Sequence, residues 1–206
     1  MEVVTLALGP VRANAYLLAS AGRAVVVDPG ADGEALAAVL AERGWRLDAV
    51  WLTHAHFDHV GGVTALLRAA GEVPVHMHPA DEPLLRNAVA SAARFGLEIE
   101  APPLDYVPLA HGETVTAGDK SALVLHTPGH APGHVAFYLP DAGIVLSGDA
   151  LFHNSIGRTD LPYGDHEELL ASIRRELLTL PPATRVLPGH GGATTVAAES
   201  ASNPFL

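Results

Sequence analysis

The strongest constraint in this chain is a ten-residue segment rich in metal-ligand side chains, Thr53–Gly62, which reads Thr-His-Ala-His-Phe-Asp-His-Val-Gly-Gly. An apolar run typical of a strand precedes it and apolar residues at helical spacing follow it, so the segment is predicted to be a strand-to-helix turn. His54, His56 and Asp58 lie two residues apart and converge in an extended turn. His59 lies at odd spacing from these three residues and can therefore serve a second binding position nearby. Because buried polar groups need partners, the pattern favours a metal site over the alternative, a solvated polar loop.

Three more ligand-type residues follow predicted strands later in the chain. His130 comes after Thr-Pro-Gly, Asp149 after Ser-Gly, and His190 after Pro-Gly. Side chains just beyond strand ends are held by the sheet yet open to solvent, which is where sites in α/β proteins lie. The complete set of candidate ligands is His54, His56, Asp58, His59, His130, Asp149 and His190. Five imidazoles and two carboxylates exceed what one ion accepts, so we expect two divalent ions.

These ligands divide between two ions if one carboxylate bridges them. We assign His54, His56 and His130 to the first ion, and Asp58, His59 and His190 to the second, with Asp149 and a hydroxide between them. Neutral imidazole with carboxylate suits zinc, iron or manganese, and we expect zinc, with iron or manganese as alternatives. The chain contains no Cys, which excludes disulfides, thiolate ligands and a cysteine nucleophile.

Composition limits the size of the fold and the partners. The chain has 206 residues, of which 49% are hydrophobic, so we expect one domain over residues 1–206. Acidic residues outnumber basic ones by 23 to 12, which argues against a nucleic-acid partner. The first residues lack a signal-peptide pattern and no apolar run is long enough for a membrane span, so we expect a cytoplasmic protein with no membrane partner. A small-molecule substrate and a monomer or small homo-oligomer are expected.

Strand and helix patterns alternate along the whole chain, which indicates an α/β protein. Strands are predicted at 2–8, 15–19, 24–28, 49–52, 73–77, 121–127, 135–139, 143–147 and 185–187. Helices are predicted at 36–43, 63–70 and 84–92, and from Asp165, which with Glu168 forms a capping-box-like start. The proline-containing segment 95–109 either borders a pocket or serves as a connection.

The His-x-His-x-Asp-His turn with its later His, Asp and His resembles the metallo-β-lactamase superfamily, from Asp28-Pro29-Gly30 to His190. The resemblance implies an αββα sandwich, α/β (α+β) in class, with two mixed β-sheets packed face to face, helices outside and metals at one edge. Residues 155–162 and the terminal Asn-Pro-Phe-Leu are similar to the glyoxalase II group, the hydroxyacylglutathione hydrolases, especially its short bacterial members. The segment 157–160 also resembles the persulfide dioxygenases, which share the fold.

The glyoxalase II resemblance implies a metallo-hydrolase in which a metal-bridging hydroxide cleaves a thioester of the lactoylglutathione type. Asp58 would be catalytic, orienting the nucleophile while it ligates a metal. A thiol has a pKa of about 8.5, so its thiolate leaves without a general acid. Arg158 is expected to bind a substrate carboxylate; the alternative is a structural bridge to an Asp such as Asp160. The helical extension that contacts glutathione in full-length enzymes has no counterpart here, so we expect the thioester chemistry to carry over better than the thiol carrier.

Two other functions fit the same residues. A persulfide dioxygenase would hold a single iron with two His and one carboxylate, which the resemblance maps to His54, His130 and Asp149. A non-catalytic metal-binding protein is the third class, and a site open at strand ends argues against it. Among the remaining residues, His134 is expected to support a ligand by a hydrogen bond rather than to be an eighth ligand. Possible pocket walls are Tyr16, Phe95, Tyr106 and Tyr163.

Overall fold

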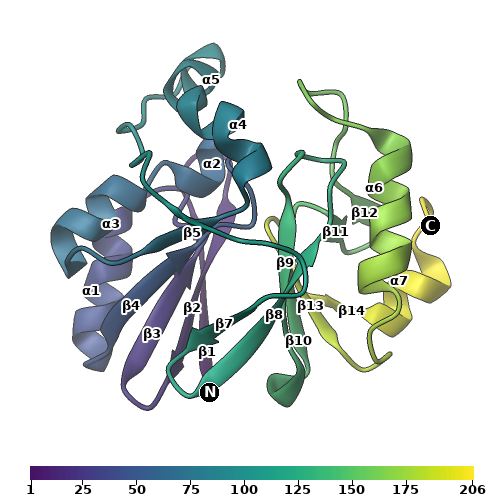
Figure 1. Ribbon diagram of the computed structural model, residues 1–206, viewed down its shortest axis with the longest axis horizontal. Helices are drawn as coiled ribbons and strands as arrows, with labels where there is room; N and C mark the ends of the chain where they lie inside the picture. Colours follow the sequence, from purple (N-terminus) through teal and green to yellow (C-terminus); the bar gives the residue numbers. More distant parts are fainter.

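Two six-stranded sheets face each other in the computed structural model, which describes all of residues 1–206 (Figure 1). The first sheet contains, in order, β1 (Glu2–Leu8), β2 (Ala13–Ser20), β3 (Arg23–Val27), β4 (Arg46–Trp51), β5 (Val75–Met77) and β6 (Val107–Pro108). The second contains, in order, β14 (Thr194–Thr195), β13 (Arg185–Pro188), β10 (Ile144–Gly148), β9 (Val135–Leu139), β8 (Lys120–His126) and β7 (Thr114–Ala117). Both sheets mix parallel and antiparallel pairs.

Helices cover the outer face of each sheet. The outer helices are α1 (Gly33–Arg43) and α3 (Val63–Ala70) on the first sheet, and α6 (His166–Ser172), its π-helical continuation Ile173–Leu177 and α7 (Val196–Ser202) on the second. Three short helices, α2 (Phe57–Val60), α4 (Glu82–Arg86) and α5 (Ala88–Arg94), lie beyond one end of the first sheet (Figure 1). A small hairpin of β11 (Leu151–Phe152) and β12 (Ser155–Ile156) follows β10. The predicted arrangement of two mixed sheets with helices outside is confirmed.

Apolar side chains fill three layers, one between the sheets and one under each set of helices. Successive side chains of a strand point to opposite faces of its sheet, so one strand contributes to two layers. In β2, Leu17 packs toward the helices and Leu18 toward the other sheet. Between the sheets the rings of Trp51 and Phe137 lie 5.0 Å apart, centroid to centroid. Burying each such side chain contributes about 1.5–3 kcal/mol, so the sheet-to-sheet contact is a main source of stability.

Most predicted elements are present with end shifts of a few residues. Strands 2–8 and 135–139 and the helix 63–70 have the predicted bounds, and Asp165 caps α6 by accepting a hydrogen bond from the Glu168 amide at 3.0 Å. The single helix predicted over 84–92 is wrong. Asn87 leaves helical geometry, with φ −99° and ψ 2°, and divides the segment into α4 and α5. The apolar stripe is the same in either arrangement, which is why spacing alone predicted one helix.

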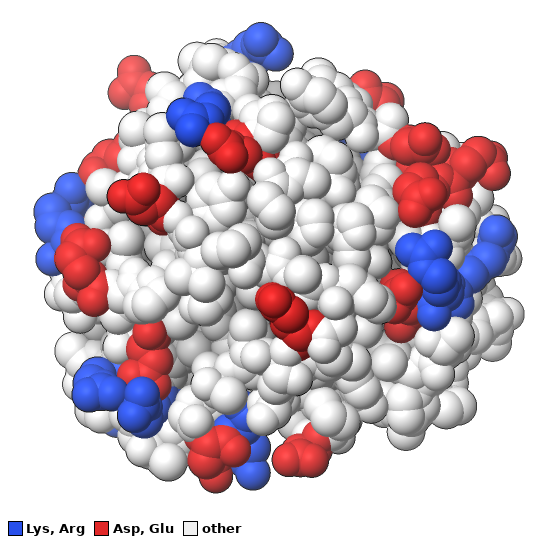
Figure 2. Space-filling view, in the orientation of Figure 1, with Lys and Arg blue, Asp and Glu red and all other residues white.

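Charged residues are dispersed over the surface. On the face shown in Figure 2, Lys and Arg lie around the periphery, most of them beside Asp or Glu, and none occupies the centre. Exposed ion pairs of this kind, such as Arg68 with Glu100 at 2.8 Å, each contribute about 0–1 kcal/mol. None of the helices combines the length and the apolar character needed to cross a membrane.

Asp81, which follows β5, ties the two halves of the sandwich together. Its side chain is fully buried and accepts hydrogen bonds from the Ala55 amide, at 2.9 Å, and the Gly133 amide, at 2.5 Å. Ala55 follows β4 of the first sheet, and Gly133 precedes β9 of the second. Burial raises the pKa of Asp81 to about 6, against the effect of these two amide donors. A Cβ on Gly133 would lie 2.7 Å from the Asp81 nitrogen, so this contact also requires glycine.

We expect Asp81→Asn to destabilise the metal-free protein by about 1–3 kcal/mol, because an amide has only one acceptor oxygen and leaves one buried N–H unpaired. Urea unfolding of both proteins measures the difference. The exposed Asp105 makes no side-chain hydrogen bond or ion pair, and Asp105→Asn is the matched control, with an expected change below about 0.5 kcal/mol. Equal midpoints for the two variants would contradict the role assigned to Asp81.

Candidate metal centre

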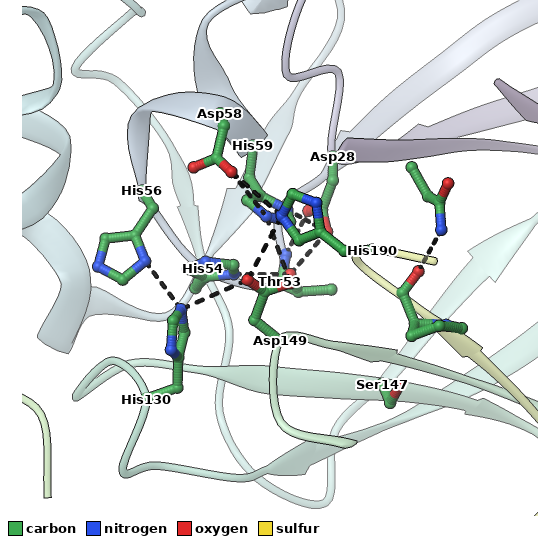
Figure 3. A network of polar contacts seen from close by, with 12 residues as sticks. Asp28, Thr53, His54, His56, Asp58, His59, His130, Ser147, Asp149 and His190 are labelled. Atoms are coloured by element: carbon green, nitrogen blue, oxygen red, sulfur yellow. Dashed lines mark hydrogen bonds and ion pairs between the residues drawn. The ribbon is translucent and has the colours of Figure 1, made fainter. Parts of the chain in front are cut away.

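All seven predicted ligand residues come together at one end of the sandwich (Figure 3). The first four lie in the loop after β4 and in α2, where the strand-to-helix turn was predicted. His130 lies on the turn between β8 and β9, Asp149 directly after β10, and His190 shortly after β13. Because β10 and β13 are parallel neighbours, their carboxyl ends place Asp149 and His190 at the same edge of the sheet.

His54 and His59 are oriented by a shared hydrogen-bond network. Asp28 accepts hydrogen bonds from the Thr53 hydroxyl at 2.6 Å and from His59 Nδ1 at 3.1 Å. Since the Thr53 hydroxyl donates to Asp28, its oxygen accepts from His54 Nδ1 at 3.0 Å. Each ring therefore carries a proton on Nδ1 and turns its Nε2 toward the centre, where a metal ion can take the place of a second proton.

His130 follows the same rule from the second sheet. Its Nδ1 donates to the main-chain oxygen of Arg158 at 2.8 Å, so Nε2 faces the centre. Nδ1 of His56 lies 2.9 Å from His130 Nε2. These two nitrogens are both turned toward the same space, where one cation can accept both lone pairs.

Three buried atoms at the centre have no hydrogen-bond partner: His54 Nε2, His59 Nε2 and Asp149 Oδ1. Leaving such atoms unpaired costs about 1–3 kcal/mol each, which a bound cation would offset. The site also depends on a missing side chain, because a Cβ on Gly189 would lie 2.0 Å from Asp149 Oδ1. The donor set and its unpaired atoms therefore fit divalent metal ions.

The electrostatics of the centre also favour positive charge. Burial, assisted by His59, lowers the pKa of His54 well below its ordinary value, so this imidazole is neutral and able to ligate. Burial acts to lower the pKa of His59 too, but the carboxylates of Asp149 and Asp58 raise it well above its ordinary value. Burial acts to raise the pKa of Asp149, and the facing imidazole of His59 nevertheless holds it below its ordinary value. The carboxylates thus create a negative potential in a buried space.

The ligand atoms fall into overlapping groups of three, within each of which all ligand atoms lie within 4.8 Å of one another. The groups are His54 with His56 and His130, His54 with His59 and Asp149, and Asp58 with His59 and His190. The first and third have the same members as the two ligand sets assigned from the sequence. Asp149 Oδ2 lies 3.6 Å from both His130 Nε2 and His190 Nε2, which places this carboxylate between the two sets.

Several supporting residues were not assigned from the sequence. Asp28 adopts the left-handed conformation, with φ 51°, at the end of β3, and its Asp-Pro-Gly turn was the only local signal. No local sequence signal marked Asp81 or Thr53 as a supporting residue. His134 is buried, and its Nε2 accepts a hydrogen bond from the Asp149 amide at 3.0 Å, so it supports a ligand as predicted.

A cavity of about 910 Å³ opens beside the ligands, and we call it the active-site cavity. Its charged and ligand-type lining residues are His56, Asp58, Arg94, His130, Asp149, Arg158 and His190. Of the expected pocket walls, Phe95 and Tyr163 line it. Tyr16 is instead buried beneath the site and donates to the Pro188 oxygen at 2.6 Å, and Tyr106 donates to Glu82 at 3.1 Å. Segment 95–109 therefore borders the cavity at its first residue.

Arg158 lines the cavity and at the same time forms an ion pair. Its Nε and Nη2 donate to the two carboxylate oxygens of Asp160, each at 2.7 Å. Both side chains are exposed, so the pair lies at the surface and not in the core. Arg94 on α5 lines the same cavity, and no carboxylate lies within 4 Å of it.

Comparison with known proteins places this geometry in a family. Residues 8–190 match the Metallo-beta-lactamase superfamily. The chain is 42% identical to the probable metallo-hydrolase YqgX of Bacillus subtilis, over 97% of this chain and 94% of that protein. It is 38% identical to the hydroxyacylglutathione hydrolase GloC of Haemophilus influenzae, over 89% of this chain and 87% of that protein.

Solved structures show the same fold. The B3 metallo-beta-lactamase BLEG-1 has a TM-score of 0.92 at 42% identity, covering 100% of this chain and 99% of its own. TTHA1623 in a di-iron-bound form has a TM-score of 0.91 at 48% identity, covering 100% of both chains. ETHE1 from Myxococcus xanthus has a TM-score of 0.80 at 28% identity, covering 99% of this chain and 84% of its own. On the family match and these identities, this chain belongs to the metallo-β-lactamase superfamily of divalent-metal enzymes.

Proposed function

We propose that this metallo-hydrolase cleaves a thioester, with a hydroxyacylglutathione such as lactoylglutathione as its substrate class. The observation that carries the proposal is the arrangement of seven ligands as two sets of three with Asp149 between them. The similarity to GloC over most of both chains supports the same branch. The terminal Asn-Pro-Phe-Leu, similar to the glyoxalase II group, agrees with it.

The proposal includes two ions, with His54, His56 and His130 around one and Asp58, His59 and His190 around the other. We propose zinc for both; iron and manganese are the alternatives, because imidazole and carboxylate suit all three. The di-iron form of TTHA1623 supports a site for two ions in this fold. When bound, such ions lower the pKa of a water molecule to about 7 and polarise a carbonyl oxygen.

The side chains around the ions complete the chemistry. Asp58 lines the active-site cavity, and its Oδ2 lies 3.2 Å from His190 Nε2, so both atoms could ligate one ion while Asp58 Oδ1 would orient the attacking water. A thiolate leaves readily, since a free thiol has a pKa of about 8.5, so no residue is required as general acid. Arg158 is proposed to bind a substrate carboxylate at the edge of the cavity.

The second candidate is a persulfide dioxygenase that uses one iron at His54, His130 and Asp149. The similarity to ETHE1 favours it. These three residues are present under both proposals, so ligand identity does not separate them. The number of bound ions and the requirement for oxygen distinguish the hydrolase from the dioxygenase.

Metal content and oxygen dependence form the first test. We expect protein purified without added metal to contain about two divalent ions per chain and to hydrolyse lactoylglutathione equally with and without oxygen. Elemental analysis and paired aerobic and anaerobic assays on lactoylglutathione and glutathione persulfide measure this. About one iron per chain, with oxygen consumed on addition of persulfide, would establish the dioxygenase instead.

Asp149→Ala tests whether one carboxylate serves both ions. We expect the variant to lose both ions on dialysis, because the negative charge between the two sets is removed. Elemental analysis after dialysis gives the stoichiometry. Asp141→Ala, at an exposed position away from the site, is the control and is expected to keep both ions. Two full equivalents in Asp149→Ala would overturn the bridging assignment.

Arg158 and Asp160 are tested as a pair. We expect Arg158→Ala to raise KM about tenfold with kcat nearly unchanged, because a charge-assisted bond to the substrate is lost. Asp160→Ala, which frees the arginine, is expected to leave KM unchanged or lower it. If both substitutions raise KM equally, Arg158 acts only through its ion pair with Asp160, and the structural alternative is correct.

A further inference from the structure

A second buried polar cluster lies on the far side of the hairpin β11–β12 and contains no metal ligand. Its centre is Glu199 on α7, whose side chain is only 1% exposed. Glu199 accepts hydrogen bonds from the Thr194 hydroxyl at 2.5 Å, the Asn154 amide at 2.9 Å and the Asn203 side-chain amide at 2.8 Å. No Lys or Arg pairs with it. A buried carboxylate persists only when such donors replace water, so these contacts form one unit, which we call the C-terminal hub.

Asn203 extends the hub in two directions. Its side-chain NH2 also donates to the Ser155 main-chain oxygen at 3.1 Å, and its side-chain oxygen accepts from the Phe205 amide at 3.1 Å. Asn203 is the first residue of the terminal Asn-Pro-Phe-Leu. This sequence therefore holds the end of the chain against the hairpin.

The hub joins segments that both begin at metal ligands. Asn154 lies in the turn of the hairpin that starts two residues after Asp149, and Ser155 begins the second strand of that hairpin. Thr194 lies four residues after His190. Asn154 is in the left-handed conformation, with φ 54°, which the hydrogen bond donated by its main-chain N–H to the Glu199 carboxylate helps to maintain. One carboxylate thus fixes the hairpin turn relative to strand β14.

The hairpin in turn forms part of the active-site cavity. Phe152, Ser155 and Ile156 line it. The ring of Phe152 lies edge-on to His190, with centroids 6.3 Å apart and an interplanar angle of 73°. Any loosening of the hairpin turn would move this wall.

We infer that Glu199 is a positioning residue that holds the hairpin wall of the active-site cavity beside Asp149 and His190. The expected effect of Glu199 on KM rests on the proposed function, whereas its expected effect on the order of the hairpin is independent of that function. The Glu199 carboxylate makes no hydrogen bond to a candidate metal ligand and does not line the active-site cavity, so it acts through the Asn154 turn and strand β14 at Thr194. The terminal Asn-Pro-Phe-Leu serves the same purpose through Asn203.

The test compares Glu199→Ala with Glu199→Gln in the full, metal-loaded protein. In the Gln variant the amide oxygen can accept from both N–H donors, while its NH2 group donates to the Thr194 hydroxyl, which can also accept. We therefore expect Gln to preserve the hub and Ala to break it. Hydrogen exchange measured by mass spectrometry should show faster exchange in residues 151–157 for Ala and wild-type exchange for Gln.

Kinetics on lactoylglutathione provide the second measurement. We expect Glu199→Ala to raise KM about tenfold with kcat within about threefold, and Glu199→Gln to restore KM. Metal content should remain at the wild-type value. Glu167→Ala, at an exposed position on α6, is the control and should change neither exchange nor KM.

Two outcomes would overturn the inference: unchanged exchange in residues 151–157 for Glu199→Ala, or a Gln variant no better than Ala. If Glu199→Ala does not fold, Thr194→Val decides, because it removes one hydroxyl without changing the shape of the side chain. We then expect faster exchange in residues 151–157 and a higher KM, each by a smaller factor than for Glu199→Ala. No change in either would count against the hub. If the wild type cleaves no thioester, the proposed function fails, and the exchange measurement still tests the hub.

Discussion

The structure depends on holding many electron-rich ligand atoms close together, because facing lone pairs repel unless outer contacts fix them or a cation lies between them. His56 Nδ1 and His130 Nε2 face each other at 2.9 Å. Three buried carboxylates outside the ligand set provide the outer contacts. Asp28 joins Thr53 to His59, Asp81 joins Ala55 to Gly133, and Glu199 joins Asn154 to Thr194. Asp28 fixes two side chains of one turn, whereas Asp81 and Glu199 each fix two separate segments that carry ligands.

The candidate ligand residues could be found from the sequence because their evidence is local. A turn such as Thr53–Gly62 places its side chains by backbone geometry alone, and His130, Asp149 and His190 follow recognisable strands. The supporting carboxylates depend instead on contacts between distant residues, such as Asp81 with Gly133, 52 positions apart. The spacing of apolar residues also did not predict the break at Asn87, since the same apolar stripe is compatible with one continuous helix or with the two helices α4 and α5. Short elements such as β11, β12 and β14 carry too few residues for any periodic pattern.

Ligand identity places the chain in its superfamily but does not choose its reaction. His54, His130 and Asp149 would be ligands under both proposals, the hydrolase and the dioxygenase, and this chain is similar to both GloC and ETHE1. Selectivity must therefore come from the walls of the active-site cavity, where Phe95 and Tyr163 come from segments outside both sheets. Such walls can change without altering the sheets, since surface loops tolerate change that a core does not.

The origin of each ligand has a thermodynamic consequence. His54, His56, Asp58 and His59 belong to the half of the molecule built on the first sheet, and His130, Asp149 and His190 to the half built on the second. Each proposed ion takes ligands from both halves, so ion binding and the packing of the two sheets are linked equilibria. Free metal concentration then sets the resistance of the whole sandwich to unfolding, and a shortage of metal would shorten the lifetime of the fold as well as stop its chemistry.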